Sequence, residues 1–187
     1  MVYIEEVLGV ASPAKYYAPV HAADDIDLKA LEKRAIELLK KIAPVKLKTS
    51  IDKIHFLPVF PKTDLGFDSE DWAKDLSAGT ANAENDVITN KTISKMCIAI
   101  WGVELLNADA DNVAYIHFMK GPNTILKIPL VPAIIEGRKI VPFPVVLIYA
   151  DEDVMNVKYY IVATGTPKIR WLCIKAVREE DSEIKSR

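Results

Sequence analysis

Histidine, cysteine and glutamine are scarce in this chain of 187 residues, which has three histidines, two cysteines and no glutamine. The histidines, His21, His55 and His117, lie far apart, and none belongs to a His-x-His pair that would place two imidazoles on one face of a strand. Unless all three meet in space, we expect no metal site and no cofactor. His55 and His117 lie in apolar, strand-like runs, so each ring is expected to be hydrogen-bonded within the fold.

The acidic turns NADADN and ADED offer too few oxygen ligands for calcium, which needs six to eight, so we interpret them as solvated turns. Motifs for nucleophilic or phosphate chemistry are also missing. The chain has no Gly-x-Ser-x-Gly, no phosphate-binding loop and no dinucleotide-binding glycine pattern. These absences favour a protein that is not an enzyme. A pair of catalytic carboxylates from distant strands stays open, because spacing in the sequence does not reveal it.

Excess positive charge and long apolar segments are absent too. The formal net charge is −2, and no run of lysine and arginine exceeds two residues, as at Lys40-Lys41, so we expect no nucleic-acid partner. The apolar run 145–150 is too short to cross a bilayer. The opening residues MVYIEEVLGV lack the basic residues and the cleavage site of a signal peptide. We expect a soluble protein of the cytoplasm or of a virion.

The missing glutamine coincides with 21 isoleucines and with 19 lysines against 5 arginines. Depletion of a thermolabile amide together with abundant lysine is typical of proteins from hyperthermophiles. Asparagine is not depleted, and an AT-rich genome would also favour isoleucine and lysine. The composition therefore favours a hot archaeal or viral source without excluding an ordinary one.

The two cysteines and three tryptophans lie in different surroundings. Cys97 and Cys173 are in apolar runs and are expected to be buried free thiols; a disulfide between them is the alternative. Trp101 and Trp171 are also in apolar runs and are expected in the core. Trp72 lies in a polar segment, is expected to be exposed, and is our candidate ligand surface.

One segment has strong helical periodicity, over residues 27–43, with Asp25 or Asp27 as its cap and Pro44 as its end. Its apolar residues at spacings of three and four fit two uses: packing on the protein's own sheet, or a seam between subunits. We favour packing on the protein's own sheet, and we take the same residues as a candidate interface for the alternative, a seam between subunits. They are Leu28, Leu31, Ala35, Leu38 and Ile42.

The rest of the chain divides by composition. Residues 1–60 are expected to hold N-terminal strands and the helix, as an arm or as part of the main fold. Residues 61–92 are expected to form a long polar loop. Residues 93–177 consist of apolar runs separated by turn signals, without helices between them, which predicts an antiparallel β-sandwich. Residues 178–187 form a charged tail.

Two details of that region bear on its topology. Residues 139–165 contain two apolar runs joined by the acidic turn DED, which we interpret as a hairpin. The prolines at 129, 132, 142 and 144 indicate edge strands or bends, because proline cannot donate a hydrogen bond to a sheet. Many runs are apolar on both faces, so we expect a second layer or another subunit to cover the sandwich.

In the rhythm of its strands, the region 93–177 resembles the jelly-roll β-sandwiches of virus capsid and spike proteins. The runs ISKMCIAIWGVELLN, NVAYIHFMK and KIVPFPVVLIYA carry that resemblance. It implies a structural subunit that assembles with copies of itself and with other virion proteins, as in a capsid or an appendage of a hyperthermophilic archaeal virus. The alternative is a β-sandwich module that binds carbohydrate or a partner protein. A β-barrel enzyme is the third reading.

Overall fold

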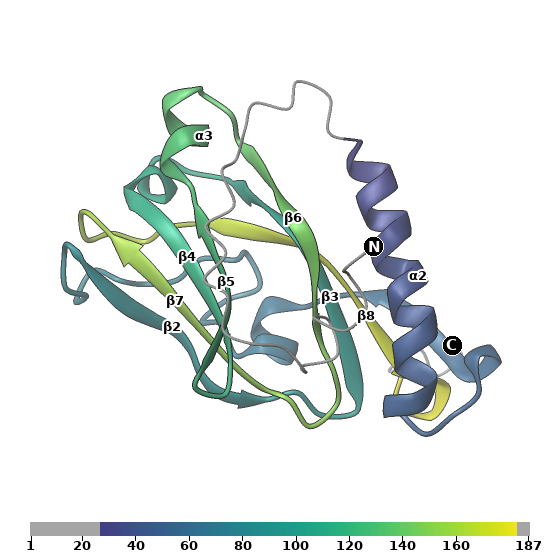
Figure 1. Cartoon of the computed structure of the whole chain (residues 1–187). Coiled ribbons are helices and arrows are strands. Elements are labelled where there is room, and N and C mark those ends of the chain that lie inside the picture. Colours follow the sequence, from purple (N-terminus) through teal and green to yellow (C-terminus); the bar gives the residue numbers. More distant parts are fainter. Residues whose placement is uncertain (1–26, 183–187) are drawn as a thin grey trace.

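The computed structural model describes residues 27–182 (Figure 1). The strands expected within residues 1–26, His21, and the end of the charged tail, residues 183–187, lie outside the described residues.

The long helix α2 spans Leu28–Lys46 and begins as the sequence predicts. The carboxylate of Asp27 accepts hydrogen bonds from two N–H groups of the first turn. The predicted end at Pro44 is wrong, because α2 continues for two residues beyond it. Proline removes only the bond to the carbonyl four residues earlier, and the last turn closes beyond it, because the N–H groups of Leu47 and Thr49 donate to the Ala43 and Pro44 carbonyls.

The described residues form two antiparallel four-stranded sheets (Figure 1). The first sheet has the order β1-β8-β3-β6, and the second sheet has the order β2-β7-β4-β5. The strands are β1 (Ile54–Pro58), β2 (Ala83–Thr92), β3 (Met96–Leu105), β4 (Val113–Lys120), β5 (Asn123–Pro129), β6 (Ile140–Tyr149), β7 (Val154–Ile161) and β8 (Ile169–Arg178). Short helical turns are η1 (Ile51–Lys53), η2 (Pro61–Leu65), η3 (Ala108–Asn112), α3 (Val131–Ile135) and η4 (Glu179–Asp181).

This strand order is that of a jelly roll. β1 pairs with β8, β2 with β7, β3 with β6 and β4 with β5, as in a long hairpin rolled up into two sheets. The predicted antiparallel β-sandwich of jelly-roll type, with a helix packed on it, is confirmed. The sandwich extends beyond the predicted 93–177, because β1 adds a strand to the first sheet and β2 adds one to the second.

The predicted hairpin over residues 139–165 is wrong. β6 pairs with β3 in the first sheet, whereas β7 pairs with β2 and β4 in the second, so the turn between them crosses from one sheet to the other. The β2–β3 connection crosses beside it: Ile93 N–H donates to the Asp153 carbonyl, and Glu152 N–H donates to the Ile93 carbonyl. Two apolar runs joined by a short turn have the same sequence pattern in two cases: when the strands pair in one sheet, and when they pack face to face in two sheets.

The predicted loop over residues 61–92 is also corrected. Its first five residues form the π turn η2, and its last ten form β2. β2 is polar because it is an edge strand of the second sheet and turns part of its surface to solvent.

The prolines indicated edge strands or bends, and this prediction is confirmed for β5 and β6. Each of these strands is the outer one of its sheet, so Pro129, Pro142 and Pro144 interrupt few ladder bonds. Pro132 lies in the first turn of α3, where its missing N–H is tolerated.

Two apolar layers hold the fold together. The larger lies between the sheets and includes Phe118, Tyr159 and Trp171. The smaller lies between the first sheet and α2 and includes Leu39 and Trp101. Both tryptophans expected in the core are therefore buried. No helix within residues 27–182 is long and apolar enough to cross a membrane.

Candidate functional site on the outer face of the second sheet

Polar side chains gather on the face of the second sheet that points away from the sandwich interior. Strand alternation puts them there: along β7, Met155, Val157 and Tyr159 are buried, whereas Lys158 and Tyr160 are only partly buried. α2 packs on the first sheet, at the other side of the sandwich (Figure 1). The outer face of the second sheet is therefore a broad polar surface of the described residues.

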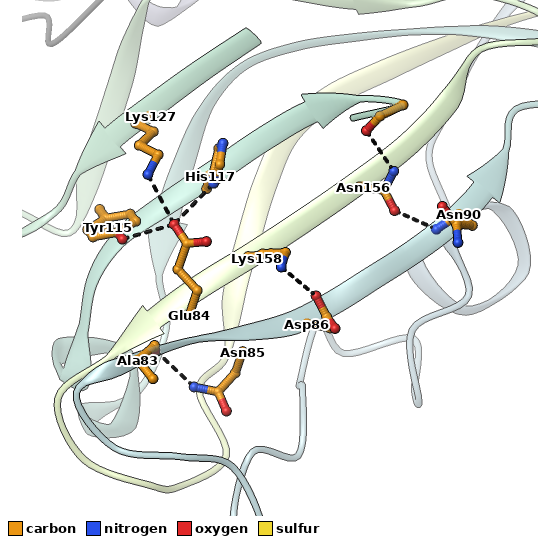
Figure 2. Close-up of polar contacts among 11 residues, drawn as sticks. Ala83, Glu84, Asn85, Asp86, Asn90, Tyr115, His117, Lys127, Asn156 and Lys158 are labelled. Atoms are coloured by element: carbon orange, nitrogen blue, oxygen red, sulfur yellow. Dashed lines mark hydrogen bonds and ion pairs between the residues drawn. The ribbon is translucent and has the colours of Figure 1, made fainter. Parts of the chain in front are cut away.

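Glu84 of β2 is the centre of a polar network on this face (Figure 2). Its Oε1 accepts a hydrogen bond from the Tyr115 hydroxyl at 2.9 Å and one from Lys127 Nζ at 3.1 Å. The same oxygen lies 3.1 Å from His117 Nδ1. These donors come from β4 and β5, so one carboxylate ties an edge strand to the far side of its sheet.

His117 is held on both sides of its ring. A carboxylate only accepts hydrogen bonds, so Nδ1 carries the hydrogen toward Glu84, and Nε2 accepts from the Thr124 hydroxyl at 2.8 Å. Burial lowers the pKa of His117, and the charge of Lys127 lowers it further, while Glu84 acts in the opposite direction. The residue is 6 % exposed, and a pKa below the ordinary 6.5 keeps the ring mainly neutral at pH 7. The expectation of a hydrogen-bonded His117 is confirmed.

Hydrogen bonds keep the carboxylate of Glu84 ionised. Burial by itself raises the pKa of Glu84, but hydrogen bonds from Lys127 and Tyr115 and the His117 ring outweigh burial, so that the pKa lies below its ordinary value. The network therefore holds a carboxylate, a lysine and a neutral imidazole at neutral pH.

An aromatic pair stands beside this network. The rings of Tyr115 and Tyr160 are stacked, with centroids 5.0 Å apart and planes 20° apart. Lys127 Nζ lies 5.0 Å from the centroid of the Tyr115 ring. Stacked tyrosines next to fixed hydrogen-bonding groups are the kind of surface that recognises a flat or hydroxyl-rich partner.

The rest of the face is also internally paired (Figure 2). Lys158 forms an ion pair with Asp86 at 3.4 Å. The Asn156 side chain accepts from the Asn90 N–H at 2.6 Å and donates to the Gly121 carbonyl at 3.0 Å. These contacts join β7 to β2 and to the turn after β4. Within residues 27–182, no group of three or more histidine, cysteine, aspartate or glutamate side chains is placed to hold a metal ion.

The expected exposure of Trp72 is wrong. Its side chain is only 9 % exposed and belongs to the core between the sheets. The indole packs against Phe67, with ring centroids 5.5 Å apart, and against Trp171 at 5.7 Å. The polar segment around it pairs with the residues before β8, where the Lys74 N–H donates to the Pro167 carbonyl, and carries this one large ring inward. A buried ring offers no free face for stacking on a sugar.

The candidate interface residues of α2 lie against the first sheet. Ala35 is fully buried there. Leu39 and Ala43 are also fully buried but were not in the predicted set, so the buried stripe of α2 differs from the predicted one. Partly buried residues pack around them: Leu31, Leu38 and Ile42. Leu28, at the start of the helix, is also partly buried. In the described chain the stripe thus packs on its own sheet; its use between subunits stays a prediction.

The acidic turns serve as hydrogen-bond acceptors, two of them for segments more than 50 positions away. Asp109 accepts from the Thr166 N–H at 2.8 Å, Asp151 from the Lys95 N–H at 2.6 Å, and Asp153 from the Ala150 N–H at 2.6 Å. These carboxylates fix the connections between strands.

Both cysteines are free thiols, on opposite sides of the first sheet. Cys97 faces α2 and Cys173 faces the other sheet, so neither points toward the other. Burial raises the pKa of Cys97 to about 11 and also raises that of Cys173.

Sequence reasoning missed Glu84, Tyr115 and Lys127 as a group. The alternation in VAYIHFMK could have placed Tyr115 and His117 on one face of a strand. Glu84 carried no such signal, because its segment has the composition of a loop.

Comparison with known proteins provides no relative: no protein-family model, no curated protein and no solved structure matches this chain. The fold and the site therefore carry the functional argument alone.

Proposed function

We propose that this protein is a non-catalytic structural subunit that assembles with copies of itself, as in the capsid or an appendage of a virion from a hot habitat. The supporting observation is the jelly-roll strand order combined with a filled interior. Jelly rolls are used in viral capsids, lectin domains and cupins. The virion assignment is an analogy at the level of the fold, and composition supports the hot habitat.

The filled interior argues against a site inside the sandwich. Phe118 packs edge-on against both Phe143 and Trp171, with ring centroids 5.5 and 5.2 Å apart. Tyr159 is also inside, where its hydroxyl accepts a hydrogen bond from the Trp171 indole at 3.1 Å. Side chains of this size occupy the space that a cupin-type enzyme would use for a ligand. Function is then a property of the surface.

Exposed apolar side chains are concentrated at one end of the sandwich. β3 and β7 begin side by side at the sheet crossings and run toward the other end, and β5 runs parallel to β7 because both are antiparallel to β4. The segments after these three strands carry four of the seven exposed large hydrophobic residues in the described chain. They are Leu106, Val131, Ile135 and Val162. This apolar end suits burial against a neighbouring copy.

Surface charge is also uneven in a way that suits contacts between copies. α2 carries six exposed basic residues against two acidic ones, whereas residues 68–75 carry four exposed carboxylates against one lysine. In a chain of net charge −2, separate surfaces of opposite sign allow one copy to meet the next head to tail.

Solution mass from light scattering, across protein and salt concentration, tests the proposal. We expect a defined oligomer that Ile135→Asn dissociates and that Val45→Asn, which leaves the charge of α2 unchanged, keeps intact. Val45 is the matched control, since it is 74 % exposed against 79 % for Ile135 and lies near the end of α2. A variant without residues 1–25 tests the N-terminal segment as an arm. A monomer at every concentration would count against self-assembly.

A binding module is the second candidate, favoured by the stacked Tyr115–Tyr160 pair on the second sheet. It predicts saturable binding of an oligosaccharide or a protein to a monomer, weakened by Tyr160→Ala. Isothermal titration against a glycan panel distinguishes it from the first proposal.

A further inference from the structure

A lysine and an aspartate from distant parts of the chain are buried together between the sheets. Lys175 of β8 and Asp64 of η2 are 9 % and 6 % exposed, and Lys175 Nζ lies 2.8 Å from Asp64 Oδ1 and 2.7 Å from Oδ2. Along β8, Lys175 alternates with Ile174 and Ala176, which face α2, so its side chain points into the sandwich. The network around Glu84 does not involve this pair.

The surroundings of the pair are built from apolar groups and one directed donor. The Phe60 ring lies 5.1 Å from Lys175 Nζ, and the Phe60 N–H donates to Asp64 Oδ2 at 2.7 Å. The π turn η2 aims Asp64 inward and ends at Gly66, whose φ of +79° is a conformation that glycine adopts without strain. Leu65, beside Asp64, is almost fully buried.

Burying two ions in such surroundings carries a desolvation cost in free energy. Removing an ammonium and a carboxylate from water costs several kcal/mol per ion, and their mutual attraction offsets that cost only in part. A lysine nitrogen held in contact with a carboxyl group also has the geometry for condensation. Condensation removes both ionisable groups for good.

We propose that Lys175 and Asp64 join in an intramolecular amide bond. Lys175 Nζ, after giving one proton to the carboxylate, attacks Asp64 Cγ, and the Nζ–Cγ bond forms. The Cγ–Oδ1 bond then breaks, and Oδ1 leaves as water with the proton it received and one more from the nitrogen. No oxidant, reductant or further reactant enters: an ammonium and a carboxylate give an amide and one water.

Three features of the site promote this step. Contact between nitrogen and carboxylate makes the reaction intramolecular, with effective concentrations of about 10⁵ M or more in well-oriented cases. The Phe60 N–H lies on Oδ2, the oxygen that becomes negative when Cγ is attacked, and so acts as an oxyanion donor. Burial excludes bulk water and so disfavours hydrolysis of the amide, which is the return reaction.

The cross-link would join residues 111 positions apart and fasten η2 to β8. A covalent link between the segment after β1 and the last strand resists opening of the sandwich from its edge. This inference goes beyond self-assembly and holds equally for a monomer, so either proposal can fail without the other.

Intact mass spectrometry of the denatured chain is the test. We expect the wild-type mass to lie about 18 Da below the sequence mass, from the loss of one water. Asp64→Asn should condense with loss of ammonia instead, giving a deficit of about 17 Da from its own sequence mass. Lys175→Met and Asp64→Ala should have their full sequence masses.

A tryptic digest locates the bond. Trypsin does not cleave after an acylated lysine, so we expect a branched peptide in which residues 63–74 are joined to residues 171–178. The ion pair of Lys120 with Asp153 is an internal control, because its atoms lie 2.7 Å apart but its side chains are 33 % and 20 % exposed. That pair should remain unlinked. Wild-type protein at its full sequence mass, with Lys175 cleaved normally, would overturn the proposal whatever the variants do.

Discussion

At Glu84, one carboxylate oxygen meets donors from two other strands of its sheet, so this side chain is expected to affect stability more than its place at an edge suggests. Glu84→Gln removes the charge and leaves Lys127 without its carboxylate partner. We expect the free energy of unfolding to fall by about 1–2 kcal/mol at pH 7, since hydrogen bonds to charged groups are the stronger ones. Urea denaturation followed by circular dichroism measures it.

Asp86→Asn is the matched control on the same strand. Its ion pair with Lys158 is longer, 3.4 Å, and the Asp86 side chain is 59 % exposed, so we expect a change within about 0.5 kcal/mol. Equal effects of the two substitutions would show that the network at Glu84 adds nothing beyond ordinary surface charge.

The same network makes stability depend on pH. The folded pKa of Glu84 lies below 4.5, so its contribution is present above that pH and is lost as pH falls through the lower folded value. The folded pKa of His117 lies below 6.5, so the unfolded chain takes up the proton first as pH falls. His117 therefore lowers the free energy of unfolding as pH falls through 6.5, and Glu84 lowers it further as pH falls below 4.5. Urea titrations from pH 7 down to pH 3 should show that Glu84→Gln lacks the part of the decline that lies below pH 4.5.

At the scale of elements, α2 is a cover for the first sheet. Leu39 is fully buried beneath it, and Leu39→Ala removes contacts that a rigid helix on a sheet cannot easily restore. We expect a loss of about 2–5 kcal/mol in the free energy of unfolding. Lys40→Ala, one position further and exposed, should change it by less than about 0.5 kcal/mol.

Protein concentration distinguishes the two roles considered for α2. Packing on its own sheet predicts that the effect of Leu39→Ala is the same at every concentration. An effect that appears only where the protein is oligomeric would instead place this side chain between subunits.

At the scale of the whole molecule, the reactivity of the two thiols measures how well the packed layers exclude solvent. Cys97 lies under α2 and Cys173 lies between the sheets, and burial raises the pKa of both. We expect neither thiol to react with a disulfide reagent at pH 8 in the folded protein, and both to react in denaturant. Rapid labelling of native Cys97 alone would mean that α2 leaves the sheet while the sandwich stays closed.

Much of the architecture could be predicted because its signals are local. Asp27 caps α2 through N–H groups two and three residues away. Alternating apolar runs and the turn residues between them fix the existence of most strands, and prolines mark β5 and β6 as edges, because each signal depends on the residue and its neighbours.

The wrong predictions concern features that contacts between residues far apart in the sequence decide. Nothing in residues 139–165 tells whether two apolar strands pair side by side or face each other across a core, since both need the same side chains. Trp72 is buried although its neighbours are polar, because Phe67 and Trp171 provide a place for one large ring. The polar residues of β2 form a strand only because β7 offers them a partner.

The polar sites show the same division. A sequence shows which residues can ionise, but not which of them meet in the fold. Glu84 and Lys127 are 43 positions apart, and Asp64 and Lys175 are 111 apart. Local sequence thus sets which segments become strands, where α2 begins and which side chains seek burial, because those preferences act over a few residues. The pairing of charges, the order of the strands and the crossings between sheets follow only from the closed sandwich, because burial brings together groups that the chain itself keeps apart.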